Sequence, residues 1–500
     1  MVRRFSQSKV LDPSPFSQPS KADMLSNDGL LLHERGRYAE AIRSFDQALA
    51  IRSRDAVTLN NRGVALNALG RHADALKSYD RALKVQPDYG CALYNRARSL
   101  DELQRHDEAL AAYDKVLALE PHHAVAHNNR GVALDTLGRS EEALESFAKA
   151  LALRPDYAEA FSNRGTALID LDRLDEAMAS YDAALALDPG DVEFNWNKSL
   201  LQLRMRQLAA GWAGHEWRRK CDTWEPRSFP GPEWDGLAPP RRQVLLYAEQ
   251  ALGDTIQFAR FARAVADAGS DVILEVQRPL AALMRSLPGI TVVAKGATPF
   301  PAFDCHLPLM SVPHRMSLPG VSVAEPYLAA EPKRTNDWRR RLAGEGLRVG
   351  IAWRGNSKAP GPSRAIPLEA FLPLSRIPGV RLISLQKDDG DGDLRRLRNA
   401  MTVETLGPDF DAGADAFLDT AAVMTSLDLV ISSDTSIAHL AGALGRPVWI
   451  AMRHVTDWRW MVQDETTPWY STARVFKQPA RGDWAGAFAR IAGDLARLAV

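Results

Sequence analysis

A repeat with a period of 34 residues organises the first half of the 500-residue chain and constrains its fold more than any other feature. One asparagine recurs six times at this spacing, at Asn27, Asn61, Asn95, Asn129, Asn163 and Asn197. Apolar residues between these positions follow helical spacing, so each unit is predicted to be two helices. Because one helix pair cannot bury its apolar face alone, successive units are expected to stack into a solenoid.

Turn residues support this division into helix pairs. Gly70 and Gly138 are expected to end helices in the left-handed conformation, and prolines such as Pro87 and Pro121 close successive units. The pattern resembles the tetratricopeptide repeat, which implies five units over residues 21–190 and a binding surface for a protein or peptide. Residues 191–240 are interpreted as a degenerate sixth repeat that serves as cap and linker, and residues 1–20 as a disordered tail.

The asparagine column has two interpretations. The carboxamides can hydrogen-bond within or between helices of the repeat. Alternatively, because a carboxamide both donates and accepts, the row from Asn27 to Asn197 can hold the backbone of an extended peptide. These positions resemble the asparagine ladder of protein O-GlcNAc transferases, and that resemblance implies an acceptor-binding role for all six.

After residue 240, short apolar runs alternate with helical patterns. The runs lie at 244–248, 272–276, 290–293, 347–353, 380–385, 427–432 and 448–451. Apolar strands separated by helices predict parallel sheets, and a Pro- and charge-rich stretch divides them into lobes at 241–335 and 345–500. We therefore predict a multidomain chain, with an all-α solenoid followed by two doubly wound α/β lobes. Ligands of such sheets bind at the carboxyl ends of the strands.

The first strand-to-helix junction of interest contains Gly253 and Asp254. Asp254 is interpreted either as a local helix cap paired with Gln257 or as a functional carboxylate facing the cleft.

The second junction contains Asp434, Thr435 and Ser436 directly after a strand. Backbone N–H groups at such a helix start favour a phosphate, and His439 shares the helical face of Thr435 and Ser436. We interpret this junction as an anion site, with His439 placed toward the anion.

A third segment follows the strand at 347–353 and is rich in cations. Trp353 and Asn356 lie in it, Arg364 lies shortly after it, and Lys387 follows the next strand. A guanidinium can bind two phosphate oxygens at once, so Arg364 is a candidate phosphate ligand; the alternative is solvated loop charge.

Residues 241–480 resemble bacterial GT-B glycosyltransferases related to the ADP-heptose heptosyltransferases. Gly253-Asp254, Asp434-Thr435-Ser436 and His439 carry the resemblance. It implies that Asp254 takes the proton from the acceptor hydroxyl and that the loop at Asp434 to Ser436 binds the donor diphosphate. Ser436 replaces the glycine of the heptosyltransferases.

Composition narrows the choice of partners. Lys+Arg and Asp+Glu both number 62, so net charge does not draw the chain to nucleic acid. No apolar run of about eighteen residues occurs, which argues against stable membrane insertion. Three cysteines far apart fit a reducing cytoplasm.

A peptide-binding solenoid joined to such lobes resembles protein O-glycosyltransferases with tetratricopeptide repeats, including enzymes that modify flagellin. We therefore expect a metal-independent glycosyltransferase that uses a nucleotide sugar as co-substrate, needs no cofactor and modifies Ser or Thr of a bound protein. The alternatives are transfer to a glycolipid or oligosaccharide, and a non-catalytic scaffold with a decayed GT-B domain.

Overall fold

The computed structural model describes residues 20–236, 242–321, 326–355, 364–387, 390–413 and 416–499. The chain forms two compact units, which we call the solenoid unit (Met1–Lys198) and the sheet unit (Ser199–Val500). Of the predicted tail, only residue 20 is described. Asn356 also lies outside the described residues.

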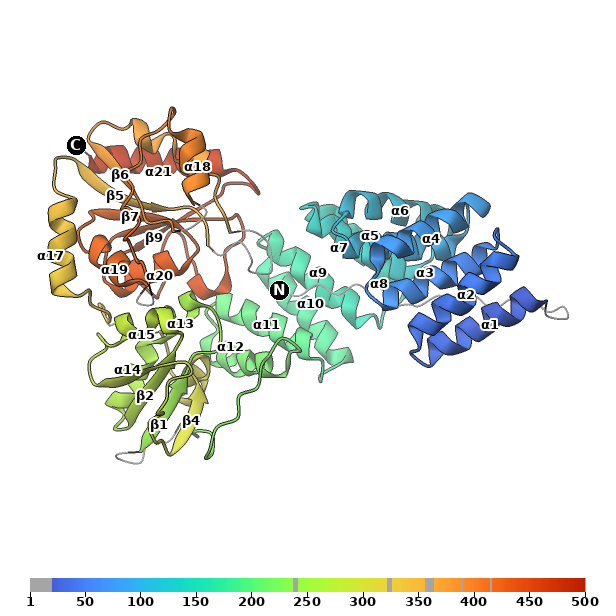
Figure 1. Ribbon diagram of the computed structural model, residues 1–500, viewed down its shortest axis with the longest axis horizontal. Coiled ribbons are helices and arrows are strands. Elements are labelled where there is room, and N and C mark those ends of the chain that lie inside the picture. Colours follow the sequence, from blue (N-terminus) through green and yellow to red (C-terminus); the bar gives the residue numbers. More distant parts are fainter. Residues whose placement is uncertain are drawn as a thin grey trace. The chain divides into compact units, whose positions relative to one another are not determined.

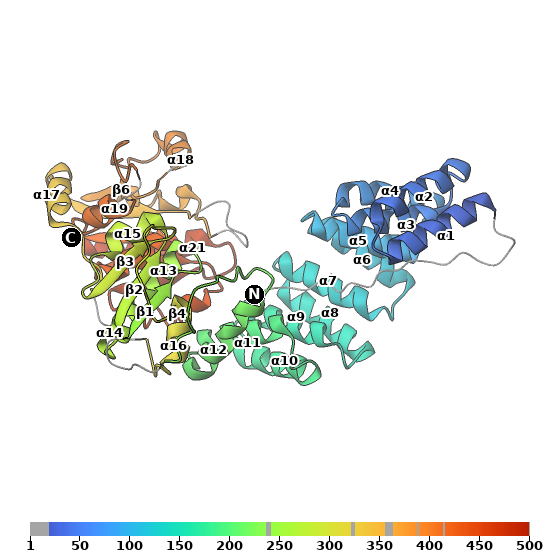
Figure 2. The same cartoon turned by 60° about the horizontal axis from the view of Figure 1, so that its bottom comes forward.

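The solenoid unit consists of successive helix pairs, shown in blue to blue-green in Figures 1 and 2. Its helices are α1 (Lys21–Glu34), α2 (Tyr38–Ile51), α3 (Ala56–Ala68), α4 (His72–Val85), α5 (Gly90–Glu102), α6 (His106–Leu119), α7 (Ala124–Thr136), α8 (Ser140–Leu153), α9 (Ala158–Asp170) and α10 (Leu174–Leu187). Gly70 and Gly138 have positive φ values of 71° and 81°, which confirms the predicted turns. The third and fifth pairs place Gln104 and Asp172 at the corresponding turns.

An aromatic ring from the second helix of each pair packs against a small residue of the first, which is glycine in four pairs and Ala97 in the third. The rings are fully buried and belong to Phe45, Tyr79, Tyr113, Phe147 and Tyr181. A Cβ placed on Gly63 would lie 2.4 Å from Cε1 of Tyr79. Glycine therefore lets the two helices approach more closely than any larger residue would.

Substituting Gly63→Val is expected to destabilise the solenoid unit by roughly 1–3 kcal/mol, because the new side chain overlaps the Tyr79 ring. Urea unfolding followed by far-UV circular dichroism measures this loss. The double variant Gly63→Val/Tyr79→Leu should lose less than the sum of the single variants, since the shorter side chain makes room. Strictly additive losses would contradict this packing account.

The N-terminal lobe of the sheet unit contains a parallel four-stranded sheet with the order β3-β2-β1-β4. Its strands are β1 (Gln243–Tyr247), β2 (Asp271–Val276), β3 (Ile290–Ala294) and β4 (Cys305–Pro308). Its helices are α13 (Leu252–Phe258), α14 (Arg260–Asp267), α15 (Arg278–Met284) and α16 (Val312–Arg315). The predicted strands are present, and β4 is additional.

The C-terminal lobe contains a parallel five-stranded sheet with the order β6-β5-β7-β8-β9. Its strands are β5 (Leu347–Ala352), β6 (Val380–Ser384), β7 (Leu429–Ser433), β8 (Val448–Met452) and β9 (Ala473–Lys477). Its helices are α17 (Pro332–Arg341), α18 (Gly390–Leu397), α19 (Leu418–Met424), α20 (Ser436–Ala443) and α21 (Trp484–Leu498). The prediction of parallel sheets is confirmed.

The predicted cap and linker region is divided differently in the structure. Helix α11 (Val192–Arg204) spans the boundary between the units, and α12 (Leu208–His215) and the residues after it belong to the sheet unit. Trp212 on α12 makes edge contacts with the rings of Phe258, Trp458 and Trp469. The segment is therefore an integral part of the sheet unit, because its aromatic side chains complete that core.

Candidate functional site

The two strand-to-helix junctions singled out in the sequence lie together in the sheet unit. Strand β1 leads into α13 and strand β7 leads into α20, so each helix starts at a carboxyl end of its sheet. A Cβ placed on Gly253 would lie 3.1 Å from Cδ2 of His439 and 3.6 Å from the backbone nitrogen of Ser436. The sequence did not reveal this close approach between the lobes.

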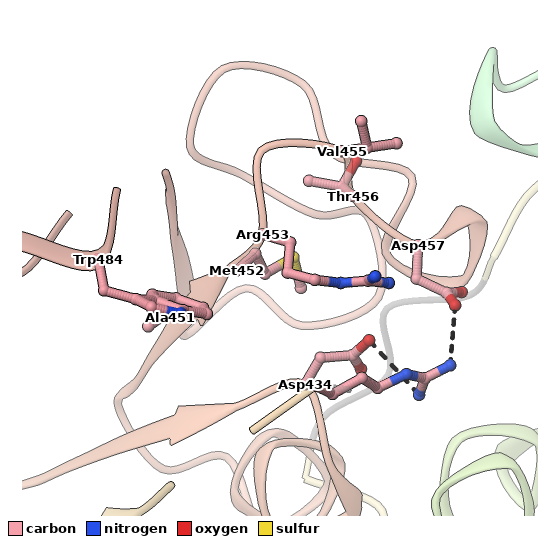
Figure 3. Close-up of a pocket in the computed structure, with 9 residues that line it drawn as sticks. Asp434, Ala451, Met452, Arg453, Val455, Thr456, Asp457 and Trp484 are labelled. Carbon is pink, nitrogen blue, oxygen red and sulfur yellow. Dashed lines mark hydrogen bonds and ion pairs between the residues drawn. The ribbon is translucent and has the colours of Figure 1, made fainter. Parts of the chain in front are cut away.

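Five alternating charges connect the lobes at this point, and we call them the charge cluster: Asp254, Arg459, Asp457, Arg364 and Asp434. Arg459 contacts Asp254 through Nε and lies 3.2 Å from Asp457 through Nη1. Arg364 lies 3.0 Å from Asp457 and 3.5 Å from Asp434. Figure 3 marks the ion pairs of Asp434 and Asp457 with dashed lines.

Asp254 is held at both carboxylate oxygens. Oδ1 contacts Arg459, and Oδ2 accepts a hydrogen bond from the backbone nitrogen of Ala251 at 3.2 Å. The predicted cap pair of Asp254 with Gln257 is wrong, because the helix starts at Leu252 and Asp254 itself reaches back to the preceding turn. Gln257 instead donates to the Arg459 carbonyl oxygen at 3.0 Å.

Burial and the neighbouring charges shift the pKa values of the groups in the cluster. Burial raises the pKa of Asp434, although Arg364 acts in the opposite direction. Burial alone would also raise the pKa of Asp457, but Arg459 and Arg364 bring it well below its usual range. Burial favours a lower pKa for Arg459, and Asp254 and Asp457 more than reverse this effect. Arg459 therefore stays charged.

His439 does not point freely toward an anion. Its Nδ1 lies 3.1 Å from the Tyr470 hydroxyl, and its ring stacks on Trp460 with centroids 4.3 Å apart. Trp460 in turn donates a 2.7 Å hydrogen bond to Asp434. Burial, followed by the charges of Arg459 and two other arginines, lowers the pKa of His439 to about 3. At neutral pH the ring is therefore uncharged and supports Trp460, which corrects the expected role as a group facing the anion.

This pKa predicts an acid-sensitive sheet unit. Between pH 6.5 and 3 the unfolded chain protonates His439 and the folded chain does not, so the free energy of unfolding falls as the pH falls through this window. At pH 5 the contribution of this histidine is about 2 kcal/mol. Urea unfolding followed by tryptophan fluorescence measures it, since every tryptophan except Trp196 lies in this unit. His439→Gln should reduce the loss between pH 7 and pH 5; an unchanged loss would contradict the assignment.

A small cavity of about 10 Å³, with room for about one water molecule, adjoins the charge cluster at the carboxyl end of β8. It is lined by Arg364, Asp434, Ala451, Met452, Arg453, Val455, Thr456, Asp457 and Trp484, as Figure 3 shows for the labelled residues. Sequence reasoning missed Arg453, Asp457, Arg459 and Trp484 as site residues. The first three lie in a polar run that follows β8, and Trp484 is the first residue of α21.

The start of α20 carries the predicted hydroxyl groups. Thr435 is the N-cap residue, and its Oγ1 lies 3.2 Å from Oγ of Ser432. Ser436 is the first residue of the helix. Oγ of Ser433 is buried and has no hydrogen-bond partner among the described residues.

Two other predicted donor-binding residues lie elsewhere. Trp353 is only 1% exposed and belongs to the core of the C-terminal lobe, where its Nε1 donates to Asp393 at 3.1 Å. Its ring is therefore buried and does not face a donor. Lys387 donates through Nζ to the carbonyl oxygen of Asp411, so its ammonium has a partner in a neighbouring loop.

The asparagine column of the solenoid unit is mostly buried. Asn61, Asn95, Asn129, Asn163 and Asn197 are between 0% and 3% exposed, whereas Asn27 is exposed. The carboxamides join neighbouring repeats, for example from Asn95 to Asn60 and from Asn163 to Asn128, each at 3.0 Å. This corrects the peptide rail at Asn95, Asn129 and Asn163, because a bound backbone would first have to break contacts between repeats. Asn61 and Asn197 are equally buried, so a peptide backbone cannot reach their carboxamides.

Family models for the tetratricopeptide repeat match residues 20–88, 54–120, 94–157 and 128–192. The N-terminal part of the chain is a tetratricopeptide-repeat solenoid. No helix in the described part of the chain is long and apolar enough to cross a membrane.

The chain is also similar to a curated protein, FlbA of Caulobacter vibrioides. The two are 27% identical over 328 residues, which cover 60% of this chain and 54% of FlbA. The chain thus spans about half the length of the curated relative it matches.

Among solved structures, the solenoid is similar to MamA of Desulfovibrio magneticus RS-1, with 24% identity, coverage of 35% of this chain and 99% of that chain, and a TM-score of 0.34. It is also similar to TTC0263, a tetratricopeptide-repeat protein of Thermus thermophilus, with 25% identity, coverage of 36% of this chain and 99% of that chain, and a TM-score of 0.31.

Proposed function

We propose that the sheet unit is a glycosyltransferase domain of the GT-B kind that moves a sugar from a nucleotide sugar to a Ser or Thr hydroxyl of a protein held by the solenoid. The observation that carries the proposal is the meeting of the two junctions. Asp254 from one sheet and the start of α20 from the other share one charge cluster. This transfer requires two neighbouring features: a base that takes the proton of a hydroxyl, and a binding site for a phosphate.

The donor phosphates are proposed to bind Arg364 and backbone N–H groups at the start of α20, where no side chain caps the helix. Arg364 is 42% exposed on its side chain, so a ligand can reach it. Phosphate oxygens would replace Asp434 and Asp457 as its partners, because a guanidinium binds two such oxygens side by side. Arg453 and Trp484 line the adjoining small cavity, and their side chains would have to move apart to contact the nucleoside part.

In the proposed step, the acceptor oxygen forms a bond to the anomeric carbon while the bond from that carbon to the phosphate oxygen breaks. The hydroxyl proton passes to Asp254, and the departing nucleotide carries the negative charge. Arg364 and the N–H groups of α20 stabilise that charge where it develops.

The contact between Arg459 and Asp254 bears on the order in which donor and acceptor bind. Its guanidinium contacts Oδ1 of Asp254, the oxygen that would accept the proton. Donor phosphates attract the same guanidinium, and their arrival would draw Arg459 away from Asp254. We therefore propose that the donor binds before the acceptor.

A non-catalytic scaffold is the second candidate, and one observation favours it. Every charge of the cluster is paired with another, as in an interface that only holds two lobes together. Transfer to a glycolipid or an oligosaccharide would use the same cluster with a different acceptor.

Thermal unfolding of the full chain with UDP-, ADP-, GDP- and CMP-linked sugars tests the proposal. One donor class at a hundred times its Kd should stabilise the sheet unit by about 2.7 kcal/mol. The stabilisation should disappear in Arg364→Ala. It should persist in Arg396→Ala, which removes an arginine paired with Glu369 on the surface of the same lobe. No shift with any donor would favour the scaffold.

A further inference from the structure

A hollow of about 530 Å³ lies on one face of the N-terminal sheet and shares no lining residue with the charge cluster. It is lined by Arg227, Phe229 and Pro230, which precede β1, by residues 300–303, which precede β4, and by Glu275 of β2. Binding sites for small molecules commonly have volumes of about 300–1,000 Å³. The hollow is therefore large enough for an organic ligand.

Three phenylalanine rings give this hollow an aromatic wall. The ring centroids of Phe229 and Phe303 lie 6.0 Å apart, as do those of Phe300 and Phe303. All three residues are partly exposed, and the Phe229 ring also packs on the buried ring of Tyr247 with centroids 4.8 Å apart. Because neighbouring rings hold one another in place, they offer a fixed apolar surface to a ligand.

An ion pair supplies the polar groups of the hollow. Nη2 of Arg227 donates to Oε1 of Glu275 at 3.0 Å, and Nη1 contacts the other carboxylate oxygen. Glu275 is buried, whereas the Arg227 side chain is 26% exposed and its guanidinium lies 4.6 Å from the centre of the Phe229 ring. Among the described residues, no other group accepts a hydrogen bond from Arg227. The remaining N–H groups are therefore available to a ligand, and the pair carries no net charge.

A second, more polar hollow of about 270 Å³ adjoins the first, and Pro301 lines both. Its exposed polar residues lie at or next to the amino ends of their strands: Gln243, Asp271 and Thr291. Asp271 and Glu275 are four residues apart on β2, so they point to the same face of the sheet and lie about 13 Å apart. The two hollows thus form one elongated groove, which extends away from the carboxyl ends of the strands.

We propose that this groove binds a neutral oligosaccharide. A sugar ring has a face of C–H groups that packs on an aromatic ring, and hydroxyl groups that accept hydrogen bonds from a guanidinium. One sugar would lie against Phe229 and Phe300 with its hydroxyls on Arg227, and a following sugar would lie over Thr291. An acidic ligand is disfavoured, because it would compete for Arg227 with the buried carboxylate of Glu275. The site goes beyond the proposed transfer and does not depend on it.

Binding of the full chain to an array of immobilised, defined oligosaccharides tests the groove. We expect neutral oligosaccharides to bind in preference to sialylated or phosphorylated ones. Phe300→Ala removes an aromatic platform and should weaken binding of the selected oligosaccharide about tenfold in titration calorimetry. Arg227→Lys keeps a positive charge beside Glu275 but loses the planar fork of donors, and should weaken binding by a similar factor.

Leu498→Ala is the matched control, because it shortens an exposed apolar side chain on α21 of the other lobe and should leave binding unchanged. Far-UV circular dichroism should be the same for all three variants, which separates lost binding from lost folding. The selected oligosaccharide on a peptide and on a lipid in vesicles then identifies its carrier.

The groove is overturned if no oligosaccharide binds, or if Phe300→Ala binds as tightly as Leu498→Ala does. It is also overturned if binding is lost in Arg364→Ala, since the oligosaccharide would then occupy the charge cluster. The measurement uses no nucleotide sugar, so its failure is distinguishable from a failure of the proposed transfer.

Discussion

Asp254→Asn is expected to slow sugar transfer by about 10² to 10⁴-fold, because the amide cannot take the proton from the acceptor hydroxyl. Donor affinity should change by less than about threefold, since Arg364 and the start of α20 remain. Turnover is measured as release of the nucleotide from the donor in the presence of acceptor. Donor binding is measured separately by thermal unfolding.

Asp267→Asn is the matched control for this variant. Asp267 lies in the same lobe, where it is exposed and paired with Arg263, so its replacement should leave turnover unchanged. If Asp254→Asn keeps full turnover, Asp254 is not the base. Loss of donor binding together with turnover would instead assign it to holding the charge cluster in place.

Arg218→Met is expected to destabilise the sheet unit by about 3–5 kcal/mol, the usual cost of breaking a buried ion pair. Arg218 and Glu249 are each 3% exposed on their side chains and lie 2.8 Å apart. Arg218 also donates to Ser311 at 2.8 Å and contacts Glu216. Burial already raises the pKa of Glu249, and loss of Arg218 would leave that carboxyl without its counter-ion.

Urea unfolding followed by tryptophan fluorescence measures this loss. Arg263→Met breaks the exposed pair with Asp267 and should cost no more than about 1 kcal/mol. The double variant Arg218→Met/Glu249→Leu should recover most of the stability, because it leaves no unpaired charge. Equal effects of Arg218→Met and Arg263→Met would contradict the integration of residues 199–236 into the sheet unit.

The regular parts of the fold were predictable because their signals repeat or extend over several residues. The 34-residue period defined the helix pairs, and continuous apolar runs defined most strands. Strand β4 was not predicted, because its four residues, Cys305–Pro308, include a histidine and a proline. The boundary between the units near residue 199 was not predicted, because helical spacing continues through α11 and α12. Trp212 on α12 nevertheless packs into the core of the sheet unit.

The candidate site was predictable only where a residue follows a strand directly. Asp254 and Asp434 were found in this way, whereas Arg459 and Asp457 lie in an irregular segment that carries no periodic signal. Burial could not be inferred from spacing, so Trp353 and the asparagines were assigned to ligands although they pack inside the protein. The neutral state of His439 likewise depends on Trp460 and three arginines brought close only by folding.

Incorporation of labelled sugar into protein is the most direct test of the central claim. The full chain is incubated with an extract of its native cells and each nucleotide sugar in labelled form, and protein and lipid fractions are counted separately. The account predicts that label from one donor appears in a protease-sensitive fraction. Alkali should release this label, as expected for a Ser or Thr linkage, and the label should be absent with Asp254→Asn. Label confined to lipid, or no label from any donor, would contradict it.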